Sequence, residues 1–227
     1  MNVEGMRVLV VGGSGVLGSL IAAELDTRGA SVALSGRDAG RLQAAAARLQ
    51  RLAPTLALDL SRSGAPRQLV DWAAGALGGL DGVVNAAGAV AFGPLAETDP
   101  TTVEELVAID LTVPLLVMAE AIPHIQGGFI VNLTGVVAEQ PFPGMPVYVA
   151  AKTGFSAATR ALSRELRRQG ILVVDARPPH TETGLAGRSL SGTSPRFPEG
   201  LDPLVVARRI VDGIEAGEQE IPAAAFA

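Results

Sequence analysis

The sequence predicts an α/β fold, with a doubly wound parallel sheet between two layers of helices in a three-layer αβα arrangement. Short apolar runs alternate along the chain with segments whose apolar residues recur at helical spacing. The chain is 48% hydrophobic but only 4% aromatic, which suits parallel strands covered by Ala-rich helices. No repeat or linker interrupts this pattern, so we assign residues 1–227 to a single domain.

The alternation defines the expected elements in chain order. The first part predicts strands at 6–11, 31–35 and 55–60, and helices at 15–29, 38–52 and 65–77. The second part predicts strands at 81–88, 127–135 and 171–178, and helices at 100–123, 147–169 and 203–216. A segment rich in Gly, Ser and Pro, at 183–203, is expected to be a mobile loop. Strand–helix–strand units of these lengths favour right-handed crossovers and one parallel sheet.

Charge and composition argue against several classes of function. The net charge of −5 predicts no general affinity for nucleic acid or for anionic membranes. The chain has no cysteine and only two histidines, His124 and His180, so neither a disulfide nor a metal site is expected. The N-terminus lacks the pattern of a signal peptide, and we expect no segment to span a bilayer. These features predict a cytoplasmic protein.

A glycine-rich turn separates the first strand from the first helix. In VGGSGVLG, residues 11–18, Gly13, Gly15 and Gly18 fit the pattern G-x-G-x-x-G. Glycines let the backbone approach a pyrophosphate closely, and the free N–H groups of the helix N-terminus can bind it. The strand and the helix that this pattern requires are both present. We therefore favour a Rossmann-type dinucleotide site over a turn without a ligand.

The end of the second strand indicates which dinucleotide is bound. An acidic residue there would bond to the adenosine ribose and favour NAD(H), but the sequence has Gly36 followed by Arg37. An arginine can pair with a 2′-phosphate, so we favour NADP(H). The alternative is that Arg37 is a solvated charge and that Asp38 only caps the next helix.

One tyrosine and one lysine, each the only residue of its type, lie four positions apart in YVAAK, residues 148–152. A helix places Tyr148 and Lys152 on one face. A free tyrosine has a pKa of about 10, and a nearby ammonium lowers it by stabilising the phenolate. Taken alone, the pair is better explained as a packed tyrosine beside an exposed lysine on an amphipathic helix.

Several motifs together resemble the short-chain dehydrogenase/reductase family over nearly the whole chain. YVAAK matches the family's Y-x-x-x-K, NAAG at 85–88 resembles N-N-A-G, and RPPHTET at 177–183 resembles P-G-x-x-x-T. Asp59 matches an aspartate that contacts the adenine in this family. The resemblance implies hydride transfer between NADP(H) and a ketone or secondary alcohol, with Tyr148 as acid/base and Lys152 as its activator.

The resemblance also implies where the cofactor and the substrate bind. Cofactor contacts are expected from Gly12, Ser14, Gly15, Val16, Leu17, Gly18, Arg37, Asp59, Leu60, Asn85, Ala86, Gly88, Tyr148, Lys152, Pro178, Thr181 and Thr183. A mostly apolar substrate is expected, because the family's pocket positions hold Phe92, Phe142, Met145, Val147 and Leu185. The loop at 179–203 is expected to contact this substrate, and the helices at 100–123 and 147–169 to form a homodimer or homotetramer.

Three positions depart from the family pattern. Val16 replaces a glycine of the shorter members, so the turn has the G-x-x-G-x-x-G spacing from Gly12 that is seen in extended members. Gly135 stands where the family has a serine that bonds to the substrate oxygen, and we expect Thr134 to take that role if strand alternation breaks there. Asp110 replaces an asparagine that holds a water for proton relay, and it either assists catalysis or pairs locally.

Two other functions stay open. A cofactor-binding sensor or structural protein with little turnover would explain the missing serine at Gly135. An epimerase or dehydratase is suggested by the spacing of the first turn, although the short segment after the sixth strand leaves little room for a sugar-nucleotide domain. The intact Tyr–Lys pair favours the oxidoreductase.

Overall fold

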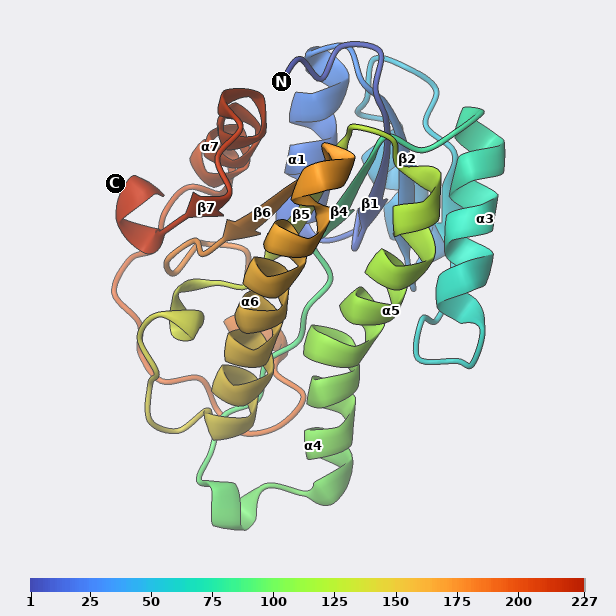
Figure 1. Ribbon diagram of the computed structural model, residues 1–227. Helices are drawn as coiled ribbons and strands as arrows, with labels where there is room; N and C mark the ends of the chain where they lie inside the picture. The colour runs from blue at the N-terminus through green and yellow to red at the C-terminus, as the bar shows by residue number, and fades with distance from the viewer. Residues whose placement is uncertain (227) are drawn as a thin grey trace.

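The computed structural model describes residues 1–226, which contain one sheet of seven parallel strands in the order β3-β2-β1-β4-β5-β6-β7 (Figure 1). The strands are β1 (Arg7–Val11), β2 (Ser31–Gly36), β3 (Thr55–Ala57), β4 (Gly82–Asn85), β5 (Phe129–Leu133), β6 (Leu172–Ala176) and β7 (Glu220–Ile221). The strand order reverses between β1 and β4, which pair directly. In doubly wound sheets, ligands bind at the carboxyl ends of the strands beside such a reversal.

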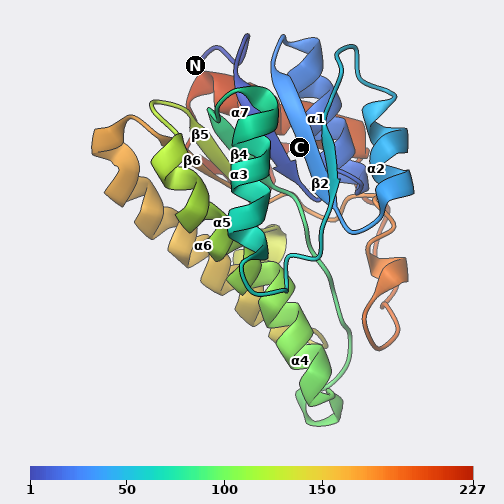
Figure 2. The ribbon, with the colours of Figure 1, turned by 90° about the vertical axis from the view of Figure 1, so that its right-hand side faces the viewer.

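Helices cover both faces of the sheet (Figures 1 and 2). One face carries α1 (Val16–Thr27), α2 (Ala39–Ala46) and α7 (Pro203–Ala216). The other face carries α3 (Ala65–Leu77), α5 (Val113–Ala121) and α6 (Pro146–Leu166). Helix α4 (Pro100–Val107) continues toward α5 and projects beyond the carboxyl edge of the sheet, beside the start of α6 (Figure 2).

The apolar runs of the sequence are buried because helices pack on both faces of each central strand. In β1, Val8 and Val10 belong to the core cluster under α1 and α7, whereas Leu9 and Val11 belong to the cluster under α3 and α5. Successive side chains of a strand point to opposite faces, so a continuous apolar run is what a doubly covered strand requires.

The predicted fold class and order of elements are confirmed, with differences in extent. The helix predicted at 38–52 ends at Ala46, and the backbone N–H of Gln50 instead bonds to the carboxylate of Asp26 over 2.5 Å. The strand predicted at 55–60 has only the three residues of β3. Strand β7 was not predicted, because two residues are too few to show a period.

The segment Pro100–His124 corrects the expectation that no apolar segment is long enough to span a bilayer. Its best window has a mean hydropathy of 1.8, and 39% of that window is buried. Length and composition are weak evidence for a membrane span, because a core helix passes the same test. The segment also contains a π-helical turn at Ala108–Thr112, a feature that frequently marks functional sites.

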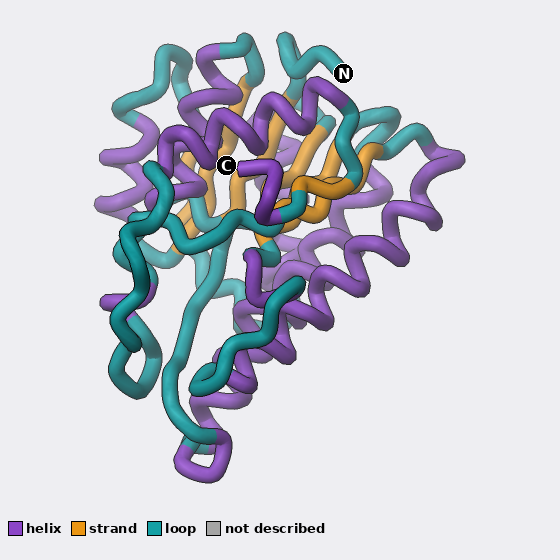
Figure 3. Tube along the Cα trace, turned by 90° about the vertical axis from the view of Figure 1, so that its left-hand side faces the viewer, coloured by secondary structure: helices purple, strands orange, loops and turns teal. Residues whose placement is uncertain are grey.

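Two long loops meet at the carboxyl edge of the sheet (Figure 3). The loop after β4 touches the predicted substrate loop, 179–203, where the backbone N–H of Phe92 bonds to the carbonyl of Ser191 over 3.0 Å. A parallel bridge between Thr181 and Leu201 closes the base of the second loop. The loops therefore form a wall beside the strand ends.

Candidate active site

The turn between β1 and α1 forms the floor of the candidate cofactor site. Gly12 has a φ of +80°, and a Cβ atom there would lie 2.5 Å from the backbone nitrogen of Ala87. A side chain at Gly18 would overlap the carbonyl oxygen of Gly12. Gly15 caps α1 without a side-chain hydrogen bond, so the first N–H groups of the helix are available to an anion. Ser14 lies in the same turn, and Val16 and Leu17 are the first two residues of α1.

The end of β2 reaches this turn. A Cβ atom at Gly36 would lie 2.6 Å from Oγ of Ser14, so a larger residue would displace the serine. Arg37 follows and is exposed. Arg41, which the sequence did not single out, donates a 3.0 Å hydrogen bond from Nη2 to the carbonyl of Ser14. The guanidinium of Arg41 therefore lies at the glycine turn, and Arg37 directly follows the strand end beside it.

Asp59 follows β3 at the same edge. Hydrogen bonds from Ser61, followed by the charges of Arg37 and Arg62, hold the pKa of the Asp59 carboxyl below its usual value. The next residue, Leu60, packs against the core. The structure thus brings Arg37 and Asp59 near each other, as a shared adenosine site requires.

The residues of NAAG do not all face the site. The side-chain amide of Asn85 is buried and donates a 2.8 Å hydrogen bond to Oδ1 of Asn132, so it links β4 to β5, and a cofactor contact from Asn85 stays a prediction. Ala86 and Ala87 instead lie half-buried beside the glycine turn, and Gly88 is exposed. A Cβ atom at Gly88 would lie 3.1 Å from a carboxylate oxygen of Asp110 and 3.5 Å from Nζ of Lys152.

Helix α6 carries Tyr148 and Lys152 one turn apart, as predicted. The Nζ atom of Lys152 lies 6.0 Å from the centroid of the Tyr148 ring. It donates a 3.0 Å hydrogen bond to the carbonyl of Leu133 and lies 3.1 Å from Oδ1 of Asp110. Within residues 1–226 the Tyr148 hydroxyl has no hydrogen-bond partner, which leaves it available to a substrate oxygen.

The electrostatics of this group differ from the expectation. Burial, and then the charge of Asp110, raise the pKa of Tyr148 above its usual value, so the predicted lowering by Lys152 is not present here. Burial also raises the pKa of the Asp110 carboxyl, and the adjacent ammonium of Lys152 opposes that rise. Tyr148 is therefore held in its protonated form.

The structure does not bring Thr134 to this group. Thr134 is fully buried, and its hydroxyl donates a 2.5 Å hydrogen bond to Oδ1 of Asp175. The expectation that Thr134 supplies the second donor to substrate is therefore wrong in this arrangement. Gly135 has φ +81° and ψ 162°, and the position of an added Cβ is open except for Pro178, whose carbonyl lies 4.0 Å away.

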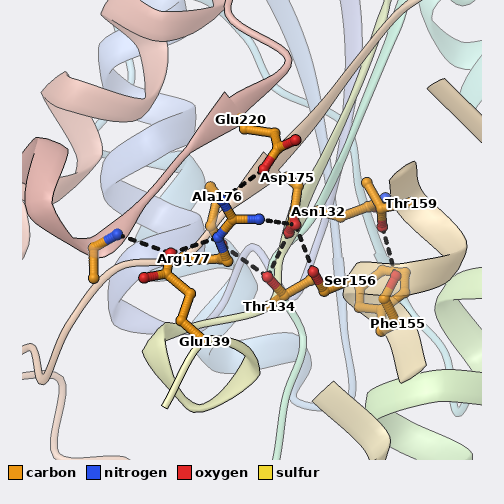
Figure 4. A network of polar contacts seen from close by, with 11 residues as sticks. Asn132, Thr134, Glu139, Phe155, Ser156, Thr159, Asp175, Ala176, Arg177 and Glu220 are labelled. Carbon is orange, nitrogen blue, oxygen red and sulfur yellow. Dashed lines mark hydrogen bonds and ion pairs between the residues drawn. The ribbon is translucent and has the colours of Figure 1, made fainter. Parts of the chain in front are cut away.

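Thr134 belongs to a buried polar network that the sequence did not reveal (Figure 4). Ser156 donates a 2.6 Å hydrogen bond to Asp175, which also pairs with Arg177 at 2.6 Å. Arg177 further pairs with Glu139 at 2.6 Å and with Glu220 at 2.7 Å. The network joins β6, α6, β7 and the residues after β5. Its long sequence separations explain why no local pattern could indicate it.

The loop after β6 carries the remaining predicted residues. Pro178 is buried, and Thr181 donates a 2.8 Å hydrogen bond to the carbonyl of Pro179. Thr183 accepts one from the backbone N–H of Leu185 over 3.3 Å. His180 stacks on Phe197 with ring centroids 4.9 Å apart. Pro178, Thr181 and Thr183 therefore lie in one loop after the carboxyl end of β6, and their contact with cofactor stays a prediction.

Apolar side chains surround Tyr148, as the predicted pocket residues suggested. Met145 and Phe92 pack in one cluster with Tyr148, together with Leu185, and Val147 packs in another. Phe142 is exposed. A cavity of 220 Å³ lies between the loop at 92–98 and the loop at 191–193. Among the described residues, no group of three His, Cys, Asp or Glu side chains could hold a metal ion.

Comparison with known proteins supports this geometry. Residues 6–193 match the family model described as short chain dehydrogenase. A relative from Xanthobacter autotrophicus, named inactive 2-(S)-hydroxypropyl-CoM dehydrogenase 2, is 32% identical over 185 residues, covering 80% of this chain and 78% of the relative.

Solved structures agree over the full length. A dehydrogenase/reductase from Sinorhizobium meliloti 1021 has a TM-score of 0.87 at 26% identity, and the alignment covers 100% of this chain and 98% of that structure's chain. A short chain dehydrogenase from Burkholderia cenocepacia J2315, in complex with NADP, has a TM-score of 0.87 at 27% identity and covers 100% of both chains. The glycine turn, the Tyr–Lys pair and the match over residues 6–193 lead to one conclusion: the chain belongs to the short-chain dehydrogenase/reductase family of oxidoreductases.

Proposed function

We propose that this protein is an NADP-dependent oxidoreductase that interconverts a ketone and a secondary alcohol. The observation that carries the proposal is the placement of the Tyr148 hydroxyl. It has no hydrogen-bond partner within residues 1–226, and it lies one helical turn from Lys152. Both residues lie at the same edge of the sheet as the glycine turn. A hydroxyl in that position can exchange a proton with a substrate oxygen.

The chain's own residues account for the proton and for binding. When bound, the nicotinamide supplies or accepts the hydride at the substrate carbon. In reduction, Tyr148 gives its proton to the carbonyl oxygen and becomes a phenolate; in oxidation, the phenolate takes the proton from the alcohol. Lys152 donates one N–H to the carbonyl of Leu133 and forms an ion pair with Asp110. We assign a further N–H of its ammonium to the cofactor ribose.

The cofactor site fits a phosphorylated dinucleotide. The segment Gly12–Gly18 provides free backbone N–H groups at the start of α1. A side chain at Gly12 or Gly18 would overlap neighbouring backbone atoms, so glycine at both positions permits this close packing. Gly36 has no room for an acidic side chain, Arg37 directly follows it, and Arg41 bonds to the carbonyl of Ser14 in the turn. These features favour NADP(H) over NAD(H), because a guanidinium pairs with a 2′-phosphate.

The surroundings of Tyr148 favour a small, mostly apolar carbonyl substrate. The two apolar clusters that include Tyr148 contain Phe92, Met145, Val147 and Leu185. We further propose that residues 1–227 act as one cytoplasmic domain, and that α4, α5 and α6 form a homodimer or homotetramer.

The test combines turnover with cofactor binding. NADPH oxidation is followed with a panel of apolar ketones for the natural protein and for Tyr148→Phe. We expect the substitution to lower turnover on the order of 10²–10⁴-fold while NADPH binding, measured by fluorescence, stays nearly unchanged. Substantial turnover in the Phe variant would show that another group moves the proton.

A second candidate is a cofactor-binding protein with little turnover. One observation favours it: the Thr134 hydroxyl is bound to Asp175 and Gly135 has no side chain, so no second donor beside Tyr148 is present at these positions. The Xanthobacter relative is itself named inactive. NADPH binding without turnover of any ketone would support this candidate.

A further inference from the structure

Asp110 is a fully buried carboxylate at the centre of the site, within the π-helical turn Ala108–Thr112. Its Oδ1 atom lies 3.1 Å from Nζ of Lys152 and accepts a 3.3 Å hydrogen bond from the backbone N–H of Ala89. Its Oδ2 atom is buried and has no hydrogen-bond partner among residues 1–226. A buried carboxylate oxygen without a hydrogen bond lowers the stability of the fold, so its retention indicates a role other than stability.

The pair changes what Lys152 can do for Tyr148. An isolated ammonium beside a tyrosine stabilises the phenolate, because opposite charges attract. Here a carboxylate contacts the same ammonium, so the ionised pair has no net charge. A phenolate that forms beside this pair is attracted by Lys152 and repelled by Asp110, so the repulsion offsets the stabilisation that Lys152 alone would give.

We propose that Asp110 is a positioning and charge-compensating residue that pairs with Lys152, keeps Tyr148 protonated, and thereby favours carbonyl reduction across neutral pH. The proposal rests on the proposed function for its kinetic consequence, although the state of Tyr148 can be measured without turnover. Reduction uses the protonated tyrosine as a proton donor. Oxidation needs the phenolate as a base, so it requires a higher pH.

The charged groups near Tyr148 support this assignment. On α6 the nearby charge is Lys152, and on the π-helical turn it is Asp110. From α4, from the loop after β4 and from the loop after β6, apolar side chains pack in the clusters that include Tyr148. In the substrate loop, His180 and Glu182 lie 3.4 Å from each other. Asp110 is therefore the negative charge that acts on the Tyr148 hydroxyl.

Asp110 is ionised in the range where Tyr148 titrates. Burial raises the pKa of the Asp110 carboxyl, but the ammonium of Lys152, 3.1 Å from Oδ1, opposes that rise by stabilising the carboxylate. A tyrosine with a raised pKa begins to ionise only above about 10. Throughout that range Asp110 repels the phenolate.

The single tyrosine makes the test direct. Because Tyr148 is the only tyrosine in the chain, tyrosinate absorbance near 295 nm on alkaline titration reports this residue alone. We expect no tyrosinate in the natural protein up to about pH 10.5, and half-ionisation about one to two pH units lower in Asp110→Asn than in the natural protein. The matched control is Glu105→Gln, an exposed carboxylate on α4, which should titrate like the natural protein. Circular dichroism at each pH confirms that the protein stays folded.

A kinetic arm separates charge compensation from a merely structural role. In Asp110→Asn the alkaline limb of the ketone-reduction profile, and the rise of alcohol oxidation, should both move to lower pH by the same one to two units. A structural role would lower activity without moving either profile. If no substrate turns over, the proposed function fails, but the absorbance titration still decides the role of Asp110.

Two results would overturn the proposal. One is ionisation of Tyr148 below about pH 9 in the natural protein, a measurement that does not depend on the folding of any variant. The other is an identical tyrosinate titration in a folded Asp110→Asn protein.

Discussion

The hydroxyl of Thr134 donates a 2.5 Å hydrogen bond to Oδ1 of Asp175, and both residues are fully buried. The same hydroxyl lies 3.3 Å from the carbonyl oxygen of Ala176. Thr134 therefore joins the end of β5 to β6, and its side chain faces the polar network instead of Tyr148. This contact assigns the threonine to stability.

Thr134→Val tests that assignment. We expect turnover to change less than about twofold, because the hydroxyl does not reach the site. The free energy of unfolding should fall by about 1–3 kcal/mol, since Asp175 loses a hydrogen-bond donor while it stays buried. Urea denaturation and NADPH-dependent ketone reduction measure the two effects. Thr134→Ser, which keeps the hydroxyl, is the matched control, and a large loss of turnover in Thr134→Val would return the threonine to catalysis.

Gly135 explains why a serine cannot simply be restored. Its backbone, at φ +81° and ψ 162°, lies in a region that is almost restricted to glycine. Gly135→Ser should cost about 1–3 kcal/mol in strain although the space is open. Gly135→Ala has the same strain without the hydroxyl, so a difference in turnover between the two variants isolates the hydroxyl.

The choice of cofactor is tested at Arg37 and Arg41. NADPH should bind more tightly than NADH by about 1–3 kcal/mol, because a guanidinium makes charge-assisted bonds to the 2′-phosphate. Arg37→Ala should remove most of that difference and leave NADH affinity nearly unchanged. Arg41→Ala should remove less, since its Nη2 already bonds to Ser14. Titration of each cofactor by fluorescence gives the affinities, and equal affinities in the natural protein would contradict the assignment.

The parts of the site that the sequence predicted are those that depend on local spacing. Tyr148 and Lys152 share a helix face because they are four residues apart, and the turn at Gly12 follows from glycines between a strand and a helix. Strand and helix order also follows from local periodicity. These features need no knowledge of distant contacts.

The parts that could not be predicted depend on contacts between distant segments. Thr134 faces away because Asp175, 41 residues later, accepts its hydrogen bond. The raised pKa of Tyr148 depends on burial and on Asp110, 38 positions earlier in the chain. Arg41 reaches Ser14 across 27 residues. A carboxylate or an arginine in the sequence does not reveal which partner the fold will give it.

Arg177 holds three carboxylates together, and its loss should be severe. Arg177→Met would leave Asp175 buried with its charge unpaired, so we expect the free energy of unfolding to fall by about 3–5 kcal/mol. The double variant with Asp175→Asn should recover part of this loss, because the buried charge is then absent. Urea denaturation of both variants measures the coupling. A single variant as stable as the natural protein would contradict the role of the network.

The pair Arg7–Asp81 predicts a dependence of stability on pH. Asp81 accepts hydrogen bonds of 2.9 Å from the backbone N–H of Arg7, and of 2.7 Å each from Nε and Nη2. These contacts hold the pKa of the Asp81 carboxyl below its usual value. Because the folded pKa is lowered, the unfolded chain binds more protons between the two values. The contribution is therefore complete above the unfolded pKa of about 3.9 and is lost as the pH falls through the folded value.

Asp81→Asn removes this linkage while it keeps the size of the side chain. At pH 7 the variant should be about 1–2 kcal/mol less stable than the natural protein, as expected for charge-assisted hydrogen bonds that are only partly shielded from solvent. The difference should stay constant from pH 7 to pH 5 and shrink below about pH 4, as Asp81 of the natural protein becomes protonated. Urea denaturation at a series of pH values measures both proteins, with the exposed Glu105→Gln as control. A difference that grows as the pH falls would have the wrong sign for a carboxylate with a lowered pKa and would show that Arg7 does not stabilise the charged form of Asp81.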